Sequence, residues 1–386
     1  MGVTVSSFFS GIGGLDLGFE WAGASVNWAT DICPIATETY PLNFGRALAQ
    51  ADVRALSHSQ IPTSDIIIGG PPCQSFSLAG LRRPEDERGK LVFRFLEIIR
   101  AKKPAGFVIE NVPGIAATRI NGERLTHYLA RELESLGYFV NTMKLNAADY
   151  LVPQLRKRIF IVGSRVSPVA TPDPDEFANN VFGLSQADYD LGTWAALQDL
   201  GKTVGKGEWS TYSKPAASDF AALMREGNSD FSLHEMPRMS DTDSMLVKFI
   251  PPGGNYMDVP DEYSTQRILN FKRTGGRTTS YGRLHPLRPA YTINTYFRRP
   301  NVGANFHPVE DRLISVREAM RLQSIPDRFR IAKLGPQDER NALVGNAVPP
   351  LLAHAVAREL LRSIGMQADT IMNSDLSKTE DLAGGG

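Results

Sequence analysis

The sequence predicts an α/β fold with a mostly parallel sheet, followed by a smaller region of irregular structure. Through residues 1–166, short apolar runs typical of buried strands alternate with longer segments of helical periodicity. From residue 167 to about residue 310 this alternation stops, and Pro, Gly, Ser and Asp become frequent. The length of 386 residues fits two domains, or one domain with a large insertion.

The alternation begins with a strand over residues 3–9 and a glycine-rich turn that leads into a helix ending near Gly23. A strand at 25–30 and a short helix from Pro34 to about Tyr40 follow, because proline suits the first turn of a helix. The other expected strands are 65–68, 107–110 and 158–163, and the other expected helices are 90–101, 122–136, 316–324 and 349–364. The polar tail 366–386 is expected to be disordered.

The composition excludes few classes of function. Lys plus Arg and Asp plus Glu are both 42, so any case for a nucleic-acid partner depends on local clusters of charge. The two cysteines cannot form a disulfide scaffold and lack nearby metal-ligand residues, so a reducing cytoplasm is expected. We expect neither an export leader nor a membrane span, because no basic and apolar leader and no apolar run near 18 residues is present.

Charge is unevenly distributed in the middle of the chain. Residues 171–262 are rich in acids, whereas residues 263–309 contain no Asp or Glu. The cations of this second stretch are Arg267, Lys272, Arg273, Arg277, Arg283, Arg288, Arg298 and Arg299. The stretch is either a solvated face or a surface for the backbone of a polyanion.

A glycine-rich turn and two acids at strand ends predict a cofactor site. The segment FSGIGG at 9–14 lies between a strand and a helix, where backbone can approach a ligand closely, although a simple tight turn is the alternative. Asp31 ends the next strand, where an acid can bind ribose hydroxyls, and Asp52 follows a further short segment. Helix capping explains each acid singly. Together they favour an adenosine-containing cofactor without a pyrophosphate.

Cys73 follows the strand 65–68 in the segment GGPPCQSFSLAG. Open α/β sheets bind ligands at the C-terminal ends of their strands. A lone cysteine is more often structural. Here small residues and serines surround it and a long polar loop follows, so we interpret Cys73 as a nucleophile.

Polar side chains also accompany two later strands. Glu110 ends the strand 107–110, where it is a helix cap, an ion-pair partner or a group aimed into the same cleft. Gln154, Arg156 and Arg158 share one face of an extended segment, because strand side chains alternate. Burying them without partners is costly, so they either form a polar site or lie at a surface strand edge.

Six segments now show a family resemblance. In order, they are FSGIGGLDLGFEWAG, GGPPCQSFS, ENVPG, QLRKRIFIVG, VREAMRLQSIPD and VGNAVPP. Their order and spacing, from residue 4 to about residue 360, resemble the signature motifs of the DNA (cytosine-5)-methyltransferases, particularly the bacterial restriction–modification enzymes.

The resemblance implies a Rossmann-like S-adenosylmethionine-dependent methyltransferase sheet with a smaller, irregular, mainly β target-recognition domain. The large domain would be 1–166 and the small domain 167–335. Residues 336–365 would return to the large domain.

The resemblance also implies a mechanism. Cys73 would attack C6 of a cytosine that is rotated out of the duplex, and C5 would then take the methyl group of S-adenosyl-L-methionine, leaving S-adenosyl-L-homocysteine. Glu110 would bind N3 and the exocyclic amine of the base. Arg158, with Arg156, would lie near O2 and the cysteine. No metal is expected.

Two further sets of residues are assigned by the same resemblance. The cofactor set is Phe9, Gly11, Ile12, Gly13, Asp31, Ile32, Asp52, Val53, Leu91, Asn346 and Ala347. The DNA-binding set is Gln74, Ser75, Ser77, Arg82, Arg83, Lys272, Arg273, Arg277, Arg298 and Arg299, of which those before residue 84 belong to a loop expected to close on the flipped base.

The implied partner is double-stranded DNA, bound by a monomer in the bacterial cytoplasm, at the nucleoid when on DNA, and a cognate restriction endonuclease would act on the same site. Two alternatives remain. An RNA (tRNA) cytosine-5 methyltransferase would share the catalytic core, but the variable segment is longer than such an enzyme needs. A non-catalytic DNA-binding protein on the same fold would not need Cys73, Glu110 and both arginines.

Overall fold

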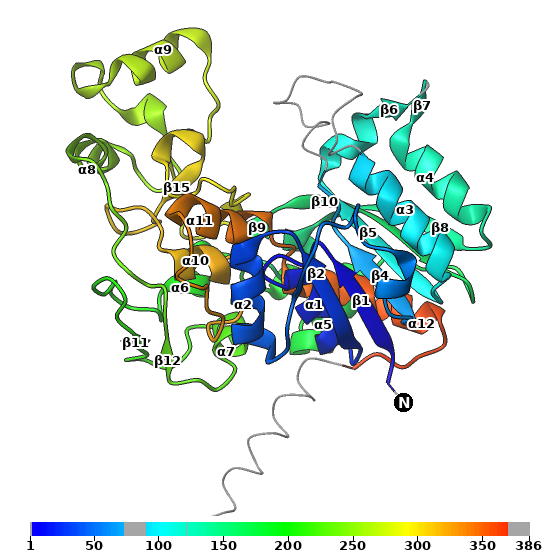
Figure 1. Cartoon of the computed structure of the whole chain (residues 1–386). Helices are drawn as coiled ribbons and strands as arrows, with labels where there is room; N and C mark the ends of the chain where they lie inside the picture. Colours follow the sequence, from blue (N-terminus) through cyan, green and yellow to red (C-terminus); the bar gives the residue numbers. More distant parts are fainter. Residues whose placement is uncertain (1, 73–89, 121, 370–386) are drawn as a thin grey trace, which may run out of the picture. The chain divides into compact units, whose positions relative to one another are not determined.

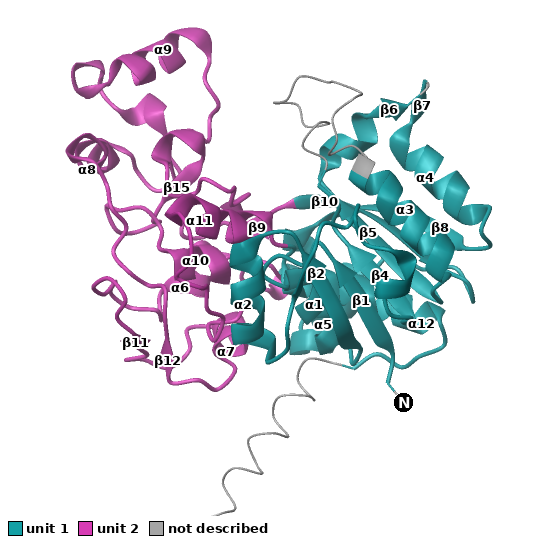
Figure 2. Cartoon of the chain, viewed as in Figure 1, with its two compact units in different colours: residues 1–150, 157–187, 348–386 teal, residues 151–156, 188–347 magenta. Residues whose placement is uncertain are grey.

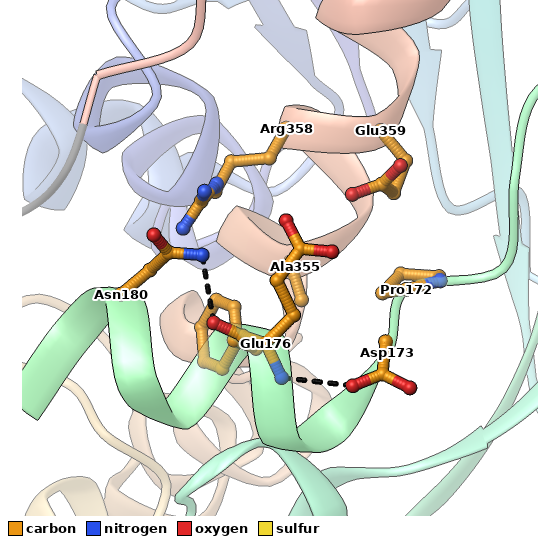
Figure 3. Close-up of a pocket in the computed structure, with 8 residues that line it drawn as sticks. Pro172, Asp173, Glu176, Asn180, Ala355, Arg358 and Glu359 are labelled. Carbon is orange, nitrogen blue, oxygen red and sulfur yellow. Dashed lines mark hydrogen bonds between the residues drawn. The ribbon is translucent and has the colours of Figure 1, made fainter. Parts of the chain in front are cut away.

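The computed structural model describes residues 2–72, 90–120 and 122–369. The chain forms two compact units (Figure 2): unit 1 comprises residues 1–150, 157–187 and 348–386, and unit 2 comprises residues 151–156 and 188–347. These boundaries differ from the predicted ones. Residues 167–187 belong to unit 1 because they include a helix that packs on it, and residues 336–347 belong to unit 2.

Unit 1 is built on a seven-stranded sheet (Figure 1) with the order β3-β2-β1-β4-β5-β10-β8. In that order the strands are β3 (Ala49–Gln50), β2 (Ser25–Asp31), β1 (Thr4–Phe8), β4 (Ile66–Gly69), β5 (Gly106–Asn111), β10 (Lys157–Ser164) and β8 (Phe139–Asn146). The first five run parallel, and β10 is antiparallel to both of its neighbours. The predicted α/β fold with a mostly parallel sheet is confirmed. The sequence did not reveal β8, because this edge strand is half exposed and lacks a continuous apolar run.

The helices of unit 1 pack in two groups. They are α1 (Gly14–Trp21), α2 (Pro34–Phe44), α3 (Lys90–Lys102), α4 (Leu125–Glu134), α5 (Pro174–Phe182) and α12 (Pro350–Ser363). The apolar sides of α3 and α4 form one core cluster with Phe8, Ile67, Phe107, Ile109 and Ile161 of the strands. Outside this cluster, α12 packs on α1 and α5 packs next to the 3₁₀ turn Ala147–Tyr150.

The C-terminal segment returns to unit 1 at Val348. The Val348 carbonyl lies where a Cβ on Gly14 would be, so the first residue of α1 must lack a side chain. One turn along, Gly18 lets the same helix approach Ala353 of α12. Residues 366–369, predicted to belong to a disordered tail, are described, and the Asp369 N–H donates to the Ala22 carbonyl (3.2 Å). The rest of that tail lies outside the described residues.

Unit 2 is irregular, as predicted, but it is not mainly β. Its strands have two or three residues each: β9 (Gln154–Leu155), β11 (Ser210–Thr211), β12 (Asp230–Phe231), β13 (Gly282–Arg283), β14 (Ala290–Tyr291) and β15 (Ala304–Phe306). Its helices are α6 (Thr193–Leu197), α7 (Asp219–Arg225), α8 (Asp241–Leu246), α9 (Gln266–Thr274), α10 (Val316–Arg321) and α11 (Gln337–Asn346). Several of these short helices form because a Ser or Thr side chain accepts the first free N–H group: Ser218, Ser240, Thr265 and Ser315.

A cluster of buried charges holds the helices of unit 2 together. The guanidinium of Arg321 in α10 is fully buried and forms ion pairs with Asp199 and Asp327. Arg225 of α7 donates to the second oxygen of Asp199 (2.8 Å), and the Tyr212 hydroxyl donates to Asp327 (2.5 Å). Each carboxylate therefore joins segments that are far apart in the sequence.

None of the helices in the described ranges of the chain is long and apolar enough to span a membrane.

Removing the centre of this cluster is expected to destabilise the protein. Arg321→Met leaves Asp327 buried without its main partner, so the free energy of unfolding should fall by about 3–5 kcal/mol. Urea denaturation at neutral pH measures this change. The matched control is Arg299→Met, which breaks the half-exposed Arg299–Asp338 ion pair and should cost less than about 1 kcal/mol. Equal losses in the two variants would show that the buried pairs are not the stabilising element.

Candidate functional site

The C-terminal ends of four parallel strands carry the predicted site residues of unit 1. Phe8 at the end of β1 is in register with Thr30 of β2 and with Gly69 of β4, and Gly69 is in register with Ile109 of β5. The glycine turn, Asp31, Gly70 and Glu110 follow directly. They therefore lie at one edge of the sheet, where open α/β sheets bind ligands.

Glu110 and Arg158 form an ion pair at this edge. The Arg158 Nε lies 2.9 Å from Glu110 Oε1, and the two side chains are only 11% and 10% exposed. Antiparallel pairing of β10 with β5 places Phe160 opposite Glu110, so Arg158, two residues earlier on the same face, reaches the carboxylate diagonally. Burial lowers the pKa of Arg158, and the charge of Glu110 opposes that shift. The guanidinium also donates to the Lys157 carbonyl (2.8 Å).

The chain that leads to Cys73 is fixed against the same strand. The Asn111 side-chain amide donates to the Pro71 carbonyl (2.9 Å), and this bond is buried. At Gly70, a Cβ would lie 2.9 Å from Glu110 Oε2, so the absence of a side chain leaves room for the carboxylate. Cys73 and the predicted loop residues Gln74, Ser75, Ser77, Arg82 and Arg83 lie outside the described residues.

The glycine turn has a backbone that requires glycine at two positions. Gly11 (φ 55°) and Gly13 (φ 87°) are left-handed, and Phe9 at the end of β1 is also left-handed (φ 57°). Gly11 donates its N–H to Asp31 Oδ2 (2.8 Å), and Cys33 donates its N–H to Asp31 Oδ1 (2.8 Å). Burial raises the pKa of Asp31 more than these bonds lower it. The turn and the end of β2 thus form one unit.

Asp16 connects the start of α1 with β1 and α2, a role that the sequence did not suggest. Its carboxylate is fully buried in the first turn of α1 and accepts hydrogen bonds from the Ser7 hydroxyl (2.6 Å) and the Tyr40 hydroxyl (2.7 Å). Burial raises the pKa of Asp16 to about 6. The signal in the sequence is an acid two residues after GIGG, within the otherwise apolar first turn of the helix.

The arrangement fits an adenosine-containing cofactor. Apart from its chain neighbours, no heavy atom of the described residues lies within 4 Å of the position that a Cβ on Gly11 would take, so the backbone there is open to a ligand. Ile32, beside Asp31, is 59% exposed and offers an apolar surface, whereas Ile12 and Val53 are buried. Asp52 forms an ion pair with Arg54 (2.6 Å), which lowers the pKa of its carboxyl.

The remaining residues predicted to bind the cofactor are distributed over both units. Leu91 lies at the start of α3 and is half-buried. Asn346 is the last residue of α11 and Ala347 follows it, both in unit 2 and directly before the segment that returns to unit 1.

Gln154 and Arg156 belong to unit 2, whereas Arg158 belongs to unit 1. The residues expected to share one face are therefore assigned to different units. The Arg156 guanidinium is fully buried and donates to the carbonyls of Ile293 (2.9 Å) and Gly345 (2.7 Å). Gln154 accepts a hydrogen bond from the Ile293 N–H (3.1 Å). These contacts favour a role for Arg156 in positioning the segment before Asn346 rather than in contacting a base.

The predicted DNA-binding cations of unit 2 differ in their surroundings. Lys272 is paired with Asp261 (2.6 Å), and Arg299 with Asp338. Arg273 and Arg277 are exposed, and burial lowers the pKa of Arg298. Within the same acid-free stretch Arg283 is structural, because its buried guanidinium donates to three carbonyls and to Asp311.

Comparison with known proteins identifies the family. The family model for the C-5 cytosine-specific DNA methylase matches residues 3–362. The chain is 32% identical over 364 residues to the Type II methyltransferase M.NgoFVII of Neisseria gonorrhoeae, covering 92% of this chain and 86% of that protein. It is also 32% identical over 375 residues to M1.HphI of Haemophilus parahaemolyticus, covering 94% and 87%.

Solved structures agree with this assignment. A prophage-encoded DNA modification methyltransferase from E. coli has a TM-score of 0.71 at 25% identity, with 94% of this chain and 99% of that chain covered. The S. pombe Dnmt2 methyltransferase, at 17% identity and a TM-score of 0.55, shares the fold. The chain thus belongs to the C-5 cytosine-specific DNA methylase family and is a DNA (cytosine-5)-methyltransferase.

Proposed function

We propose that this enzyme methylates one cytosine within a specific duplex sequence, after rotating that base out of the stack and adding Cys73 to its C6. The observation that carries the proposal is the Glu110–Arg158 pair, which lies beside the anchored backbone at Pro71. A carboxylate and a guanidinium on neighbouring strands can bind the polar edge of a base that a cysteine attacks.

Each residue at this edge of the sheet would have a different role in the reaction. The Cys73 thiolate would add to C6, which converts C5 into an enamine-like carbon that takes a methyl group; loss of the C5 proton then allows the thiolate to leave. Arg158 would favour the thiolate, because a neighbouring cation lowers the pKa of a cysteine. Glu110 would bind N3 and the exocyclic amine and so hold the ring in place for addition.

S-Adenosyl-L-methionine would supply the methyl group and become S-adenosyl-L-homocysteine. The glycine turn would provide close backbone contact, Asp31 would accept from the ribose hydroxyls, and Ile32 would cover an apolar part of the ligand. Asp52, Val53, Leu91 and the Asn346–Ala347 segment would complete the site. The raised pKa of Asp31 reflects a desolvated carboxylate, in which a hydrogen bond to a ligand counts for more than in water.

Unit 2 would read the bases around the target, with the exposed Arg273 and Arg277 as candidates for DNA contacts. The curated relatives are Type II methyltransferases, which supports a role in protecting the DNA of a bacterial host against a restriction endonuclease of the same specificity. We propose a monomer that acts in the cytoplasm.

Expression in a host that lacks cytosine methylation tests the reaction directly. Bisulfite sequencing should show one protected cytosine in a recurring sequence, and Cys73→Ser should abolish protection, since serine cannot supply a thiolate at neutral pH. Binding of S-adenosyl-L-homocysteine should survive that substitution. Methyl transfer to tRNA but not to duplex DNA would instead establish the RNA enzyme.

Gly70→Ala is expected to slow catalysis without unfolding the protein. The added methyl group would lie 2.9 Å from Glu110 Oε2, and the end of that side chain can move aside. Displacing it should lower the single-turnover rate about 10–100-fold, approaching the loss of two orders of magnitude expected for Glu110→Ala. The melting temperature serves as the control. An unchanged rate in Gly70→Ala would mean that the position of Glu110 is not critical.

Asp31→Ala should weaken cofactor binding. It removes a charged acceptor and also releases the Gly11 N–H, which together correspond to a loss of about 10–100-fold in affinity. Isothermal titration with S-adenosyl-L-homocysteine measures this effect. Asp65→Asn is the matched control, because Asp65 accepts from Thr4 at the start of β1, on the opposite edge of the sheet. Equal affinity of the two variants for S-adenosyl-L-homocysteine would show that Asp31 does not contribute to cofactor binding.

A further inference from the structure

A small hairpin follows β5 directly after the site (Figure 1). The chain leaves Glu110 through the 3₁₀ turn Pro113–Ala117 and forms β6 (Arg119–Ile120) and β7 (Glu123–Arg124) before α4 begins. Ile115 and Leu125, on either side of the hairpin, are buried in the main core of unit 1. The Leu125 N–H also donates to the Thr118 carbonyl (2.9 Å) and extends the ladder. The hairpin is thus fixed to the edge that carries Glu110.

Two arginines face each other across this ladder. Arg119 and Arg124 are direct partners in the antiparallel register, so their side chains leave the same face of the hairpin about 5 Å apart at Cβ. Like charges at such positions repel and destabilise a hairpin. Both residues are exposed. This unfavourable pairing requires a compensating anion or a solvent-screened surface.

Among the described residues, few acids compensate these two charges. Residues 112–131 contain three arginines and a single acid, Glu123, and that acid is paired with the third arginine, Arg131 (3.1 Å). Arg119 donates to the Gly122 carbonyl (2.5 Å). The Arg124 side chain has no hydrogen-bond or ion-pair partner among the described residues.

The start of α4 adds to the positive potential. Among the described residues no side chain caps this helix and its first turn contains no acid, so the N–H groups after Leu125 and the helix dipole present partial positive charge next to Arg124. Lys157, at the start of β10, is exposed on the same edge of the sheet. Because the whole chain has no net charge, this local excess of positive charge is not a consequence of its composition.

We propose that Arg119 and Arg124 clamp a backbone phosphate of the DNA beside the nucleotide that enters the Glu110 site. The inference rests on the proposed function and extends it, because it assigns unit 1 a contact that is independent of base sequence. Two guanidiniums on one face match the oxygens of a single phosphate, and arginine binds phosphate in a bidentate manner. Such a contact fixes the position of the duplex but does not read its sequence.

The salt dependence of DNA binding tests the proposal. Affinity of the full-length chain would be measured by fluorescence anisotropy from 50 to 200 mM salt, on a labelled duplex carrying the site found by bisulfite sequencing and on one of equal composition without it. Loss of one phosphate contact lowers the slope of log affinity against log salt by about 0.9, or about 3.5-fold in affinity across this fourfold range. We expect that change on both duplexes for Arg119→Gln/Arg124→Gln.

Two matched variants exclude other causes. Arg119→Lys/Arg124→Lys keeps both charges and should retain most of the slope. Lys103→Gln removes an exposed cation that precedes β5, at the opposite edge of the sheet, and should leave the slope unchanged. If the double glutamine variant melts early, Arg124→Gln alone provides the test, since this side chain makes no bond in the described structure that its loss would break.

The outcomes separate this inference from the proposed function. A wild-type slope in the glutamine variants, or an equal loss in Lys103→Gln, would overturn the clamp even if the wild-type enzyme methylates DNA. Absence of methylation by the wild-type chain would instead overturn the proposed function, while the duplex without the site would still report on the clamp.

Discussion

Parallel alignment of β1, β2, β4 and β5 is the constraint on which the candidate site depends. Because these strands run in one direction and in close register, the segments that follow them emerge together at one edge of the sheet. The glycine turn, Asp31, Gly70 and Glu110 are thereby gathered from four separate parts of the sequence. The antiparallel strand β10 then begins at that same edge, which places Arg158 within ion-pair distance of Glu110. A parallel β10 would have delivered this arginine to the far end of the sheet.

Because the charged groups of the site are removed from water, each of them needs a partner of opposite charge. The Glu110–Arg158 pair is almost fully removed from water, so neither charge is tolerated without the other or a ligand to replace it. In unit 2, too, buried charges are bonded to polar partners, and more of them are present. It has little regular sheet, and its buried Arg156, Arg283 and Arg321 bond to carbonyls and carboxylates of distant segments. Such bonds are directional, and they fix irregular backbone in a way that apolar packing alone would not.

The distribution of charge explains how a neutral chain can bind a polyanion. Acids neutralise part of the acid-free stretch of unit 2 through the pairs Lys272–Asp261 and Arg299–Asp338, so the count of cations in the sequence overstates the free positive charge there. At the β6–β7 hairpin the number of cations is small, but two arginines lie opposite each other there. Pairing, rather than composition, decides which cations can attract DNA.

The sequence by itself determined the α/β class, the main strands and helices of unit 1, and the placement of Glu110 at a strand end, because buried parallel strands and amphipathic helices are encoded by local apolar patterns. It also carried the motifs that resemble the family. Only the tertiary structure decided that β8 completes the sheet, that Gly70 makes room for Glu110, and that Asn111 holds Pro71. It also assigned Arg156 and Arg158 to different compact units, although the two are only two residues apart. The physical reason is that a side chain's direction is set locally, whereas its partner, such as Gly345 for Arg156, comes from a segment nearly two hundred residues away.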